Sequence, residues 1–320
     1  MSIILSSLSR NSGGFFFLHG YGGTCKTFIW RVLTSFLRAQ GMIVLVVASS
    51  GIASLLLPGG RTSHSKFCIP ISITEHSVCN IQKGSDVAEL LQLTKLIIWD
   101  EASRIHKLCF EALDRTLRDI MTITNDTAQN FPFGGLTVVL GGDFRQILPV
   151  IPGGNRNEIV YASVKSSYIW QHCQVLSLTK NLRLHCTTSS HDAPMLHDFA
   201  KWTLDIGEGR TGEPNDGEAL IQIPSAFLLI ESDNTMAAIV NNTYTGLYSK
   251  LGDQNYLKDH AILSLTRDVV QEVNEYMLSL TGSENKDYIS SDSVCNASYD
   301  TDRPENIYTS DMSNCINVSG

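Results

Sequence analysis

The sequence predicts an α/β fold built on a parallel sheet, and three observations support it. First, an apolar run, a glycine-rich loop and a segment with helical spacing follow one another over residues 15–33. Second, unbroken apolar runs recur through residues 1–190, which is typical of strands buried on both faces of a parallel sheet. Third, one of these runs ends in two adjacent carboxylates, at the edge where open α/β sheets bind ligands.

The glycine-rich loop G-Y-G-G-T-C-K-T spans Gly20–Thr27 and resembles the phosphate-binding template G-x-x-x-x-G-K-[ST]. Backbone N–H groups of such a loop cradle phosphate oxygens at the positive end of a helix. Lys26 would reach the β- and γ-phosphates, and the Thr27 hydroxyl would ligate Mg²⁺. The loop therefore predicts a nucleotide site made of these residues: Gly20, Gly22, Gly23, Thr24, Cys25, Lys26 and Thr27.

The loop departs from the template at its sixth position, where Cys25 replaces glycine. A β-carbon held in a conformation that favours glycine costs about 1–3 kcal/mol. If Cys25 tolerates those dihedral angles, nucleotide still binds, though more weakly. The alternative is a chance glycine-rich turn, which the flanking strand and helix disfavour.

The remaining elements follow from apolar runs and helical spacing. In the first part we expect strands at 42–48, 96–99, 136–140 and 175–178, and helices near 87–91 and 108–120. In the second part we expect two βα units, with strands at 226–230 and 261–265 and helices at 235–248 and 268–280. The linker between the two parts is expected within 186–194.

Asp100 and Glu101 directly follow the apolar run 96–99. In a nucleotide-hydrolysing site, Asp100 would hold Mg²⁺ and Glu101 would polarise the attacking water. Adjacent carboxylates also occur at plain solvated strand ends. Their place about 75 residues after the glycine-rich loop favours the hydrolytic interpretation.

Polar residues follow the next two strands as well. Gln146 could sense the γ-phosphate or position water. Asp143 and Arg145 fit either a local ion pair that shapes the loop or direct contact with a ligand. Arg183 lies just beyond 175–178 and fits either a surface arginine or an arginine finger on the γ-phosphate.

Earlier in the chain, residues 61–65 are rich in polar side chains and taken alone fit a polar surface turn.

Composition and charge narrow the class of protein. The 320 residues, 43% of them hydrophobic and 18% charged, are typical of a globular chain with room for two domains. No apolar run approaches the ~20 residues of a membrane span. The net charge of −8 hides an asymmetry: residues 1–190 hold 17 Lys and Arg against 11 Asp and Glu, whereas residues 191–320 hold 7 against 21. The eight cysteines form no C-x-x-C pair, which disfavours zinc and disulfide frameworks.

Taken together, the motifs resemble those of the petite integration frequency (Pif) DNA helicases, especially their plant and Helitron-transposon branch. These are superfamily-one, 5′-to-3′ motor proteins. The order and spacing of the matching stretches fit the pattern of this family over roughly residues 13–300. The stretches are G-Y-G-G-T-C-K-T (20–27), V-A-S-S-G-I-A-S-L-L-L-P-G-G-R-T-S-H-S (47–65), I-I-W-D-E-A-S (97–103), L-G-G-D-F-R-Q-I-L-P-V (140–150), L-T-K-N-L-R-L (178–184), W-T-L-D-I-G-E-G (202–209) and A-I-L-S-L-T-R-D-V-V-Q-E-V-N (261–274).

The resemblance implies a role for each matching residue. The loop lysine and threonine would serve ATP and Mg²⁺, and Asp100 and Glu101 would form the hydrolytic pair. Gln146 would couple the nucleotide state to DNA, and Arg183 would be the arginine finger. The stretch that contacts single-stranded DNA in the family corresponds to Ser50, Thr62, His64 and Ser65. Such contacts are independent of base sequence.

The resemblance also implies an architecture and its departures. We expect a RecA-like P-loop domain over 1–188 and a partial second RecA-like domain over 195–320. Cys25 is one departure from the family pattern. Two family segments also have no counterpart in this sequence: the glutamine segment that normally recognises adenine, and the late motifs of the second motor domain. The sequence therefore looks like a truncated family member, for which a working motor is in question.

The function expected from the resemblance is an ATP-dependent DNA helicase that unwinds duplex DNA, with family roles in repair, recombination and telomere maintenance. Single-stranded DNA and duplex junctions would be its partners, without a membrane, and the protein would act as a monomer in the nucleus. One alternative is an impaired remnant that binds nucleotide or DNA without unwinding. A distant third is a P-loop ATPase with a partner other than DNA.

Overall fold

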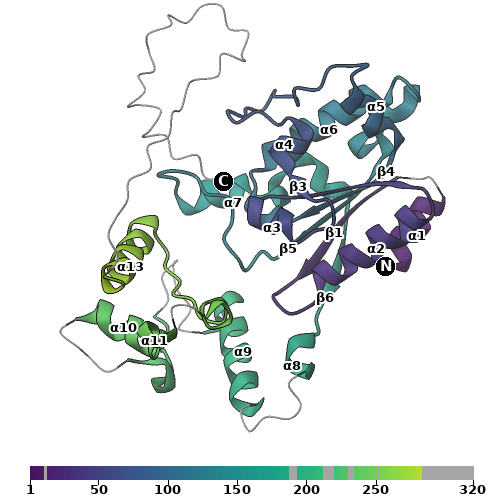
Figure 1. Ribbon diagram of the computed structural model, residues 1–320. Helices are drawn as coiled ribbons and strands as arrows, with labels where there is room; N and C mark the ends of the chain where they lie inside the picture. The colour runs from purple at the N-terminus through teal and green to yellow at the C-terminus, as the bar shows by residue number, and fades with distance from the viewer. Residues whose placement is uncertain (11–12, 187–192, 212–219, 230–233, 251–252, 283–320) are drawn as a thin grey trace, which may run out of the picture. The chain divides into compact units, whose positions relative to one another are not determined.

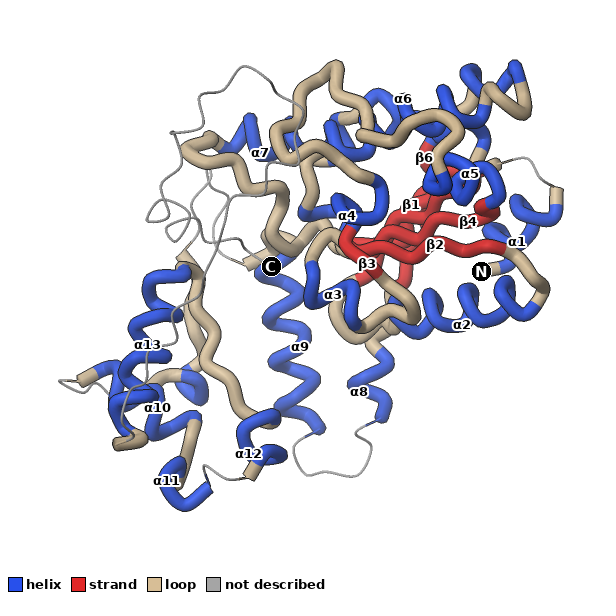
Figure 2. Tube along the Cα trace, turned by 45° about the horizontal axis from the view of Figure 1, so that its top comes forward, coloured by secondary structure: helices blue, strands red, loops and turns tan. Residues whose placement is uncertain are grey.

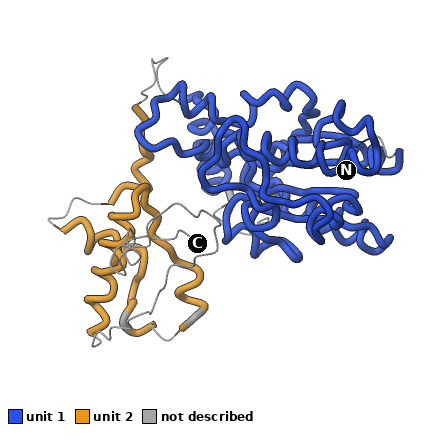
Figure 3. The backbone as a smooth tube through the Cα atoms, turned by 90° about the horizontal axis from the view of Figure 1, so that it is seen from above, with its two compact units in different colours: residues 1–211, 320 blue, residues 212–319 orange. Residues whose placement is uncertain are grey.

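The computed structural model describes residues 1–10, 13–186, 193–211, 220–229, 234–250 and 253–282. The chain divides into two compact units, Met1–Thr211 and Gly212–Ser319 (Figure 3). The first unit therefore extends past the linker expected within 186–194, of which residues 187–192 lie outside the described part. The assignment of each unit to a helicase domain stays a prediction.

A six-stranded sheet forms the centre of the first unit, and each of its strands runs parallel to its neighbours (Figures 1 and 2). The strand order is β3-β2-β4-β5-β1-β6. The strands are β1 (Gly14–Gly20), β2 (Ile43–Ala48), β3 (Arg61–Thr62), β4 (Thr94–Asp100), β5 (Thr137–Gly142) and β6 (Cys173–Leu178). The expected parallel α/β fold is confirmed.

Helices cover both faces of this sheet. Helices α1 (Ser2–Ser9) and α2 (Lys26–Ala39) lie against one face, and α4 (Ser63–Phe67), α5 (Asp86–Leu93) and α6 (Lys107–Met121) lie against the other (Figure 2). The remaining helices of the first unit are α3 (Gly51–Leu55), α7 (Arg156–Ala162), α8 (Leu182–Cys186) and α9 (Ala193–Gly207).

The two hydrophobic cores explain why the apolar runs are unbroken. Successive side chains of a strand point to opposite faces, so Phe15 and Phe17 of β1 enter the core on the α6 side. Phe16 and Leu18 enter the core on the α2 side, beside the fully buried Trp30. A central strand of a sheet covered on both faces has no position that favours a polar residue. The edge strand β6 is covered less, and Val175 is 49% exposed.

The second unit differs from its prediction. Its described residues form the 3₁₀ turn η6 (Ser225–Phe227) and the helices α10 (Thr235–Thr243), α11 (Leu247–Lys250), α12 (Gln254–Lys258) and α13 (Arg267–Leu280). The helices expected over 235–248 and 268–280 are thus largely confirmed, with a break after Thr243 in the first.

The strands predicted at 226–230 and 261–265 are wrong for the residues that the structure describes. A strand needs a neighbour that pairs with its backbone N–H and C=O groups, and the described part of this unit contains none. Leu263 and Leu265 are 91% and 101% exposed, so the apolar pattern there does not reflect burial in a sheet.

Candidate nucleotide site

The glycine-rich loop connects the carboxyl end of β1 to the first turn of α2, as predicted. Cys25 is the N-cap residue of α2 and has φ 61° and ψ 35°, in the left-handed region. The loop therefore adopts the backbone conformation that glycine would give it, with cysteine in its place. Side chains in this region cost about 1–2 kcal/mol.

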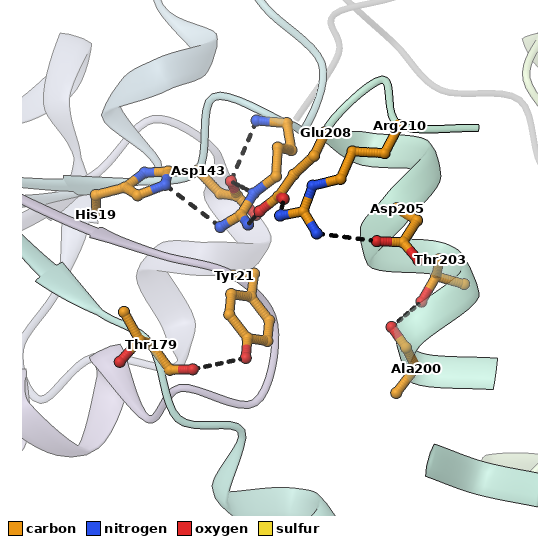
Figure 4. A network of polar contacts seen from close by, with 10 residues as sticks. His19, Tyr21, Asp143, Thr179, Ala200, Thr203, Asp205, Glu208 and Arg210 are labelled. Atoms are coloured by element: carbon orange, nitrogen blue, oxygen red, sulfur yellow. Dashed lines mark hydrogen bonds and ion pairs between the residues drawn. The ribbon is translucent and has the colours of Figure 1, made fainter. Parts of the chain in front are cut away.

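A second segment supports the loop from outside. The Leu182 N–H donates to the Gly23 carbonyl at 3.0 Å. Figure 4 shows the other contact, in which the Tyr21 hydroxyl donates to the Thr179 carbonyl at 2.9 Å. Gly23 has φ +88°, and a β-carbon there would lie 2.2 Å from Oδ1 of Asn181. Only glycine meets both the dihedral angle and the close approach, so this position accounts for one glycine of the motif.

The contacts with the second segment also locate Arg183. The Arg183 N–H donates to Oδ1 of Asn181 at 3.1 Å, so α8 begins directly beside the loop. Arg183 itself is exposed. The structure thus brings the predicted finger residue near the glycine-rich loop, and its catalytic role stays a prediction.

The loop lysine lies within the loop. Lys26 Nζ donates to the Gly20 carbonyl, and the buried Thr24 hydroxyl donates to the Tyr21 carbonyl at 2.7 Å. Thr27 is half-buried in the first turn of α2. The ammonium is therefore held beside the loop backbone, where a bound phosphate chain would replace the Gly20 carbonyl as its partner.

Asp100 ends strand β4 and is buried, and one of its carboxylate oxygens has no hydrogen-bond partner among the residues that the structure describes. Burial raises the pKa of Asp100, and Glu101 next to it adds to the rise, whereas contact with Trp30 and the charge of Lys26 oppose it. A buried carboxylate oxygen without a partner fits a hard cation such as Mg²⁺, which prefers oxygen ligands. Asp100 therefore fits a metal ligand, and the participation of Thr27 stays a prediction.

Trp30 and Gly141 support Asp100, and sequence reasoning did not identify either. A β-carbon at Gly141 would lie 2.4 Å from the Trp30 ring and 3.0 Å from Oδ1 of Asp100. Gly141 therefore lets the indole of α2 reach the carboxylate across the end of β5. The paired glycines after 136–140 were the only signal of this close approach.

Asp143 and Arg145 form the local ion pair that was one of two alternatives. Arg145 Nε lies 2.8 Å from Oδ1 of Asp143, and its guanidinium lies 4.9 Å from the centre of the Tyr21 ring. Arg145 Nη1 also lies 2.8 Å from Oε1 of Glu208, which follows α9 (Figure 4). Arg145 therefore ties the loop after β5 to the glycine-rich loop and to the end of α9.

His19 completes this contact network. Arg145 Nη2 donates to Nε2 of His19 at 3.3 Å, because a guanidinium can only donate (Figure 4). Burial lowers the pKa of His19, and the charge of Arg145 lowers it further. His19 is therefore neutral at physiological pH, with Nε2 as the accepting nitrogen.

A hollow of about 300 Å³ opens beside the loop. Its lining includes Tyr21, Gly22, Gln146 and Asn181, with Thr203 of α9 on the other side. Gln146 is thus brought to the same hollow as the glycine-rich loop. Its side chain accepts a hydrogen bond at 2.7 Å from Arg104, which lies three residues after Glu101.

The residues expected to contact DNA lie at the carboxyl ends of β2 and β3. Ser50 caps α3 by accepting from the Ala53 N–H at 3.2 Å, and Thr62 precedes α4, which contains His64 and the exposed Ser65. Burial lowers the pKa of His64. The structure brings the four residues to one edge of the sheet, and DNA contact stays a prediction.

The family model of the PIF1-like helicases matches residues 1–217. The chain belongs to the PIF1-like helicase family. Among curated relatives, the ATP-dependent DNA helicase Pif1 of Psychrobacter is 27% identical over 256 residues, which are 79% of this chain and 36% of that protein. PIF4 of Trypanosoma brucei is 32% identical over 136 residues, which are 41% of this chain and 16% of that protein.

A solved structure of Bacteroides Pif1 bound to single-stranded DNA matches the fold of this PIF1-like chain with a TM-score of 0.50 and 24% identity. The match covers 65% of this chain and 46% of that one. The chain thus spans about a third of the Psychrobacter relative's length and under half of the Bacteroides chain. The expected similarity to the fold of Pif helicases is confirmed.

Proposed function

We propose that the chain binds ATP with Mg²⁺ and hydrolyses it, as part of an ATP-dependent DNA helicase. The observation that carries this proposal is the buried Asp100 carboxylate, whose unpartnered oxygen lies within the electrostatic reach of Lys26. A protein that needed only stability would not leave one oxygen of a buried carboxylate without a partner, because desolvation destabilises the charged group. Asp100 therefore favours a function in ligand binding.

The mechanism assigns each residue one task. Lys26 and the N–H groups of residues 22–27 bind the β- and γ-phosphates, and Arg183 approaches the γ-phosphate from α8. Mg²⁺, held by Asp100 and Thr27, would neutralise charge that develops on the phosphate oxygens. Glu101 accepts a proton from the attacking water and orients it. Gln146 reports the presence of the γ-phosphate to the strand ends where DNA would bind.

The second part of the proposal is binding of single-stranded DNA by Ser50, Thr62, His64 and Ser65. Hydroxyls and backbone groups at this edge suit phosphate contacts that are independent of base sequence. The same proposal includes translocation in the 5′-to-3′ direction and unwinding at duplex junctions. It also includes action as a monomer in the nucleus, in DNA repair, recombination and telomere maintenance. They rest on membership of the PIF1-like family and on resemblance to its plant and Helitron branch.

The alternative is a chain that binds nucleotide or DNA without unwinding. The substitution at Cys25 was one reason to consider it. Because Cys25 adopts the left-handed conformation that the loop requires, the substitution leaves the backbone path of the loop intact. This observation supports hydrolysis over the alternative.

Steady-state ATP hydrolysis with and without single-stranded DNA tests the proposal. We expect hydrolysis that needs Mg²⁺, rises with DNA and is lost in Lys26→Ala, while Lys83→Ala on the far surface serves as the control. DNA binding should weaken about tenfold or more between about 50 and 200 mM salt. A folded chain that binds nucleotide and DNA but hydrolyses no ATP under any of these conditions would favour the alternative.

A further inference from the structure

Arg104 lies between two residues of the proposed hydrolytic site. It ends the 3₁₀ turn η1 (Ala102–Arg104) that follows β4, and its side chain reaches the turn after the neighbouring strand β5. Arg104 Nη2 donates to Oε1 of Gln146 at 2.7 Å, and Arg104 Nε lies 3.3 Å from Oε2 of Glu101. One guanidinium therefore contacts both side chains.

The chemistry of the guanidinium fixes the orientation of the Gln146 amide. A guanidinium has five N–H donors and no acceptor, so the atom of Gln146 that faces it must be the carbonyl oxygen. The Gln146 NH₂ group, with two donors, then points away from Arg104. An NH₂ group is the half of the amide that can bind a phosphate oxygen, whereas the carbonyl oxygen would repel it.

The contact with Glu101 is of a different kind. Glu101 has φ 55°, and its Oε2 lies within ion-pair distance of Arg104 without the geometry of a hydrogen bond. Oε2 is itself buried, so the Arg104 guanidinium at 3.3 Å is the opposite charge that compensates it. This attraction holds the Glu101 carboxylate beside Gln146.

We propose that Arg104 is a positioning residue for ATP hydrolysis, which holds the Gln146 amide with its N–H donors toward the γ-phosphate and holds the Glu101 carboxylate next to it. This inference rests on the proposed function of the site. Arg104 is 44% exposed on its side chain, so its ion pair adds little to the stability of the fold. Its contribution is the orientation of two other side chains.

The test compares binding of ADP with binding of ADP–aluminium fluoride, which mimics the phosphoryl group in transfer. The unsubstituted chain should bind the mimic more tightly than ADP. Arg104→Met should reduce that preference about tenfold and leave ADP affinity within about twofold, because charge-assisted hydrogen bonds contribute about that factor. The value of kcat should fall by a similar factor, with KM for ATP nearly unchanged.

Three further variants separate positioning from other effects. Arg104→Lys keeps the charge but lacks the planar fork, so it should resemble Arg104→Met. Gln146→Met combined with Arg104→Met should lose little more than Gln146→Met alone, since both changes remove one arrangement. Arg156→Met, at an exposed arginine that begins α7, is the control and should keep the preference.

The outcomes are distinct. If the unsubstituted chain and the control prefer the mimic and Arg104→Met prefers it equally, the role of Arg104 is overturned while the proposed function stands. Fully additive losses in the double variant would overturn it as well. If the unsubstituted chain binds neither ligand, the proposed function fails first, and the role of Arg104 fails with it.

Discussion

The conformation of Cys25 makes a prediction at the scale of one residue. Cys25→Gly should raise the free energy of unfolding by roughly 0.5–1 kcal/mol, because relief of left-handed strain outweighs the entropy that glycine loses on folding. Urea unfolding measures this change. Nucleotide affinity should also rise, since glycine leaves the phosphate cradle clear of a side chain.

Cys68 offers a matched control for this substitution. It also has a left-handed backbone, with φ 50°, and it ends α4 away from the glycine-rich loop. Cys68→Gly should stabilise the fold by a similar amount and leave nucleotide affinity unchanged. Equal gains in affinity for both variants would contradict a local effect of Cys25.

Asp100 makes a prediction about pH. Because burial raises the pKa of Asp100 in the folded chain, the folded state binds the proton more strongly than the unfolded state. Between the ordinary aspartate pKa and the raised value, this residue lowers stability progressively as pH rises, and above the raised value the loss is complete. Asp100→Asn should therefore stabilise the fold by about 1 kcal/mol at pH 8.

The comparison with acid pH provides the check. The gain from Asp100→Asn should shrink as pH falls through the raised pKa, and it should vanish below the ordinary aspartate pKa, where the carboxyl is protonated in both states. Urea unfolding of both proteins at pH 8 and at about pH 3 measures the difference. A gain that is the same at both values would show that the charge of Asp100 is not its cause.

At the scale of elements, two neighbouring glycines should behave differently. Gly23→Ala should cost about 1–3 kcal/mol or more, because φ is +88° and the new β-carbon would collide with Asn181. Gly22→Ala meets open space, so it should change stability by less than about 0.5 kcal/mol. Chemical unfolding of the pair measures how tightly the segment after β6 holds the loop. Equal costs would contradict that packing.

The contact between Arg145 and Glu208 tethers the end of α9 to the loop after β5. Glu208→Gln should weaken this tether by about 1 kcal/mol, since the pair is only partly exposed. Hydrogen exchange of α9 amides should then be about five times faster. Lys83→Met removes an exposed ion pair with Asp119 elsewhere and should leave α9 unchanged.

The sequence predicts the buried strands well because their burial on both faces leaves an unbroken apolar pattern. It fails at 261–265, where an apolar pattern exists without a strand to pair with. Asp100 and Gln146 were identifiable as polar residues at strand ends. Trp30 and Arg104 were not, because their roles come from contacts between segments far apart in the sequence, which no local pattern encodes.

At the scale of the whole molecule, the first unit should fold without the second. Both hydrophobic cores of the first unit lie within residues 1–178. A fragment of residues 1–211 should therefore keep a cooperative thermal transition within about 4 °C of the corresponding transition in the full chain, measured by circular dichroism. A fragment without cooperative unfolding would show that residues 212–320 complete the fold.

No described helix is both long and apolar enough to span a membrane.

The contact of the glycine-rich loop with the segment after β6 has a consequence for the order of folding. Tyr21 and Thr179 are 158 residues apart in the chain, and Leu182 completes the same contact. During synthesis, the loop emerges from the ribosome long before the segment that holds it. Contacts of such sequence separation form late, because closing the intervening chain costs entropy first. Competence to bind nucleotide should thus be acquired near the end of the folding of this unit, although the motif that confers it lies near the beginning.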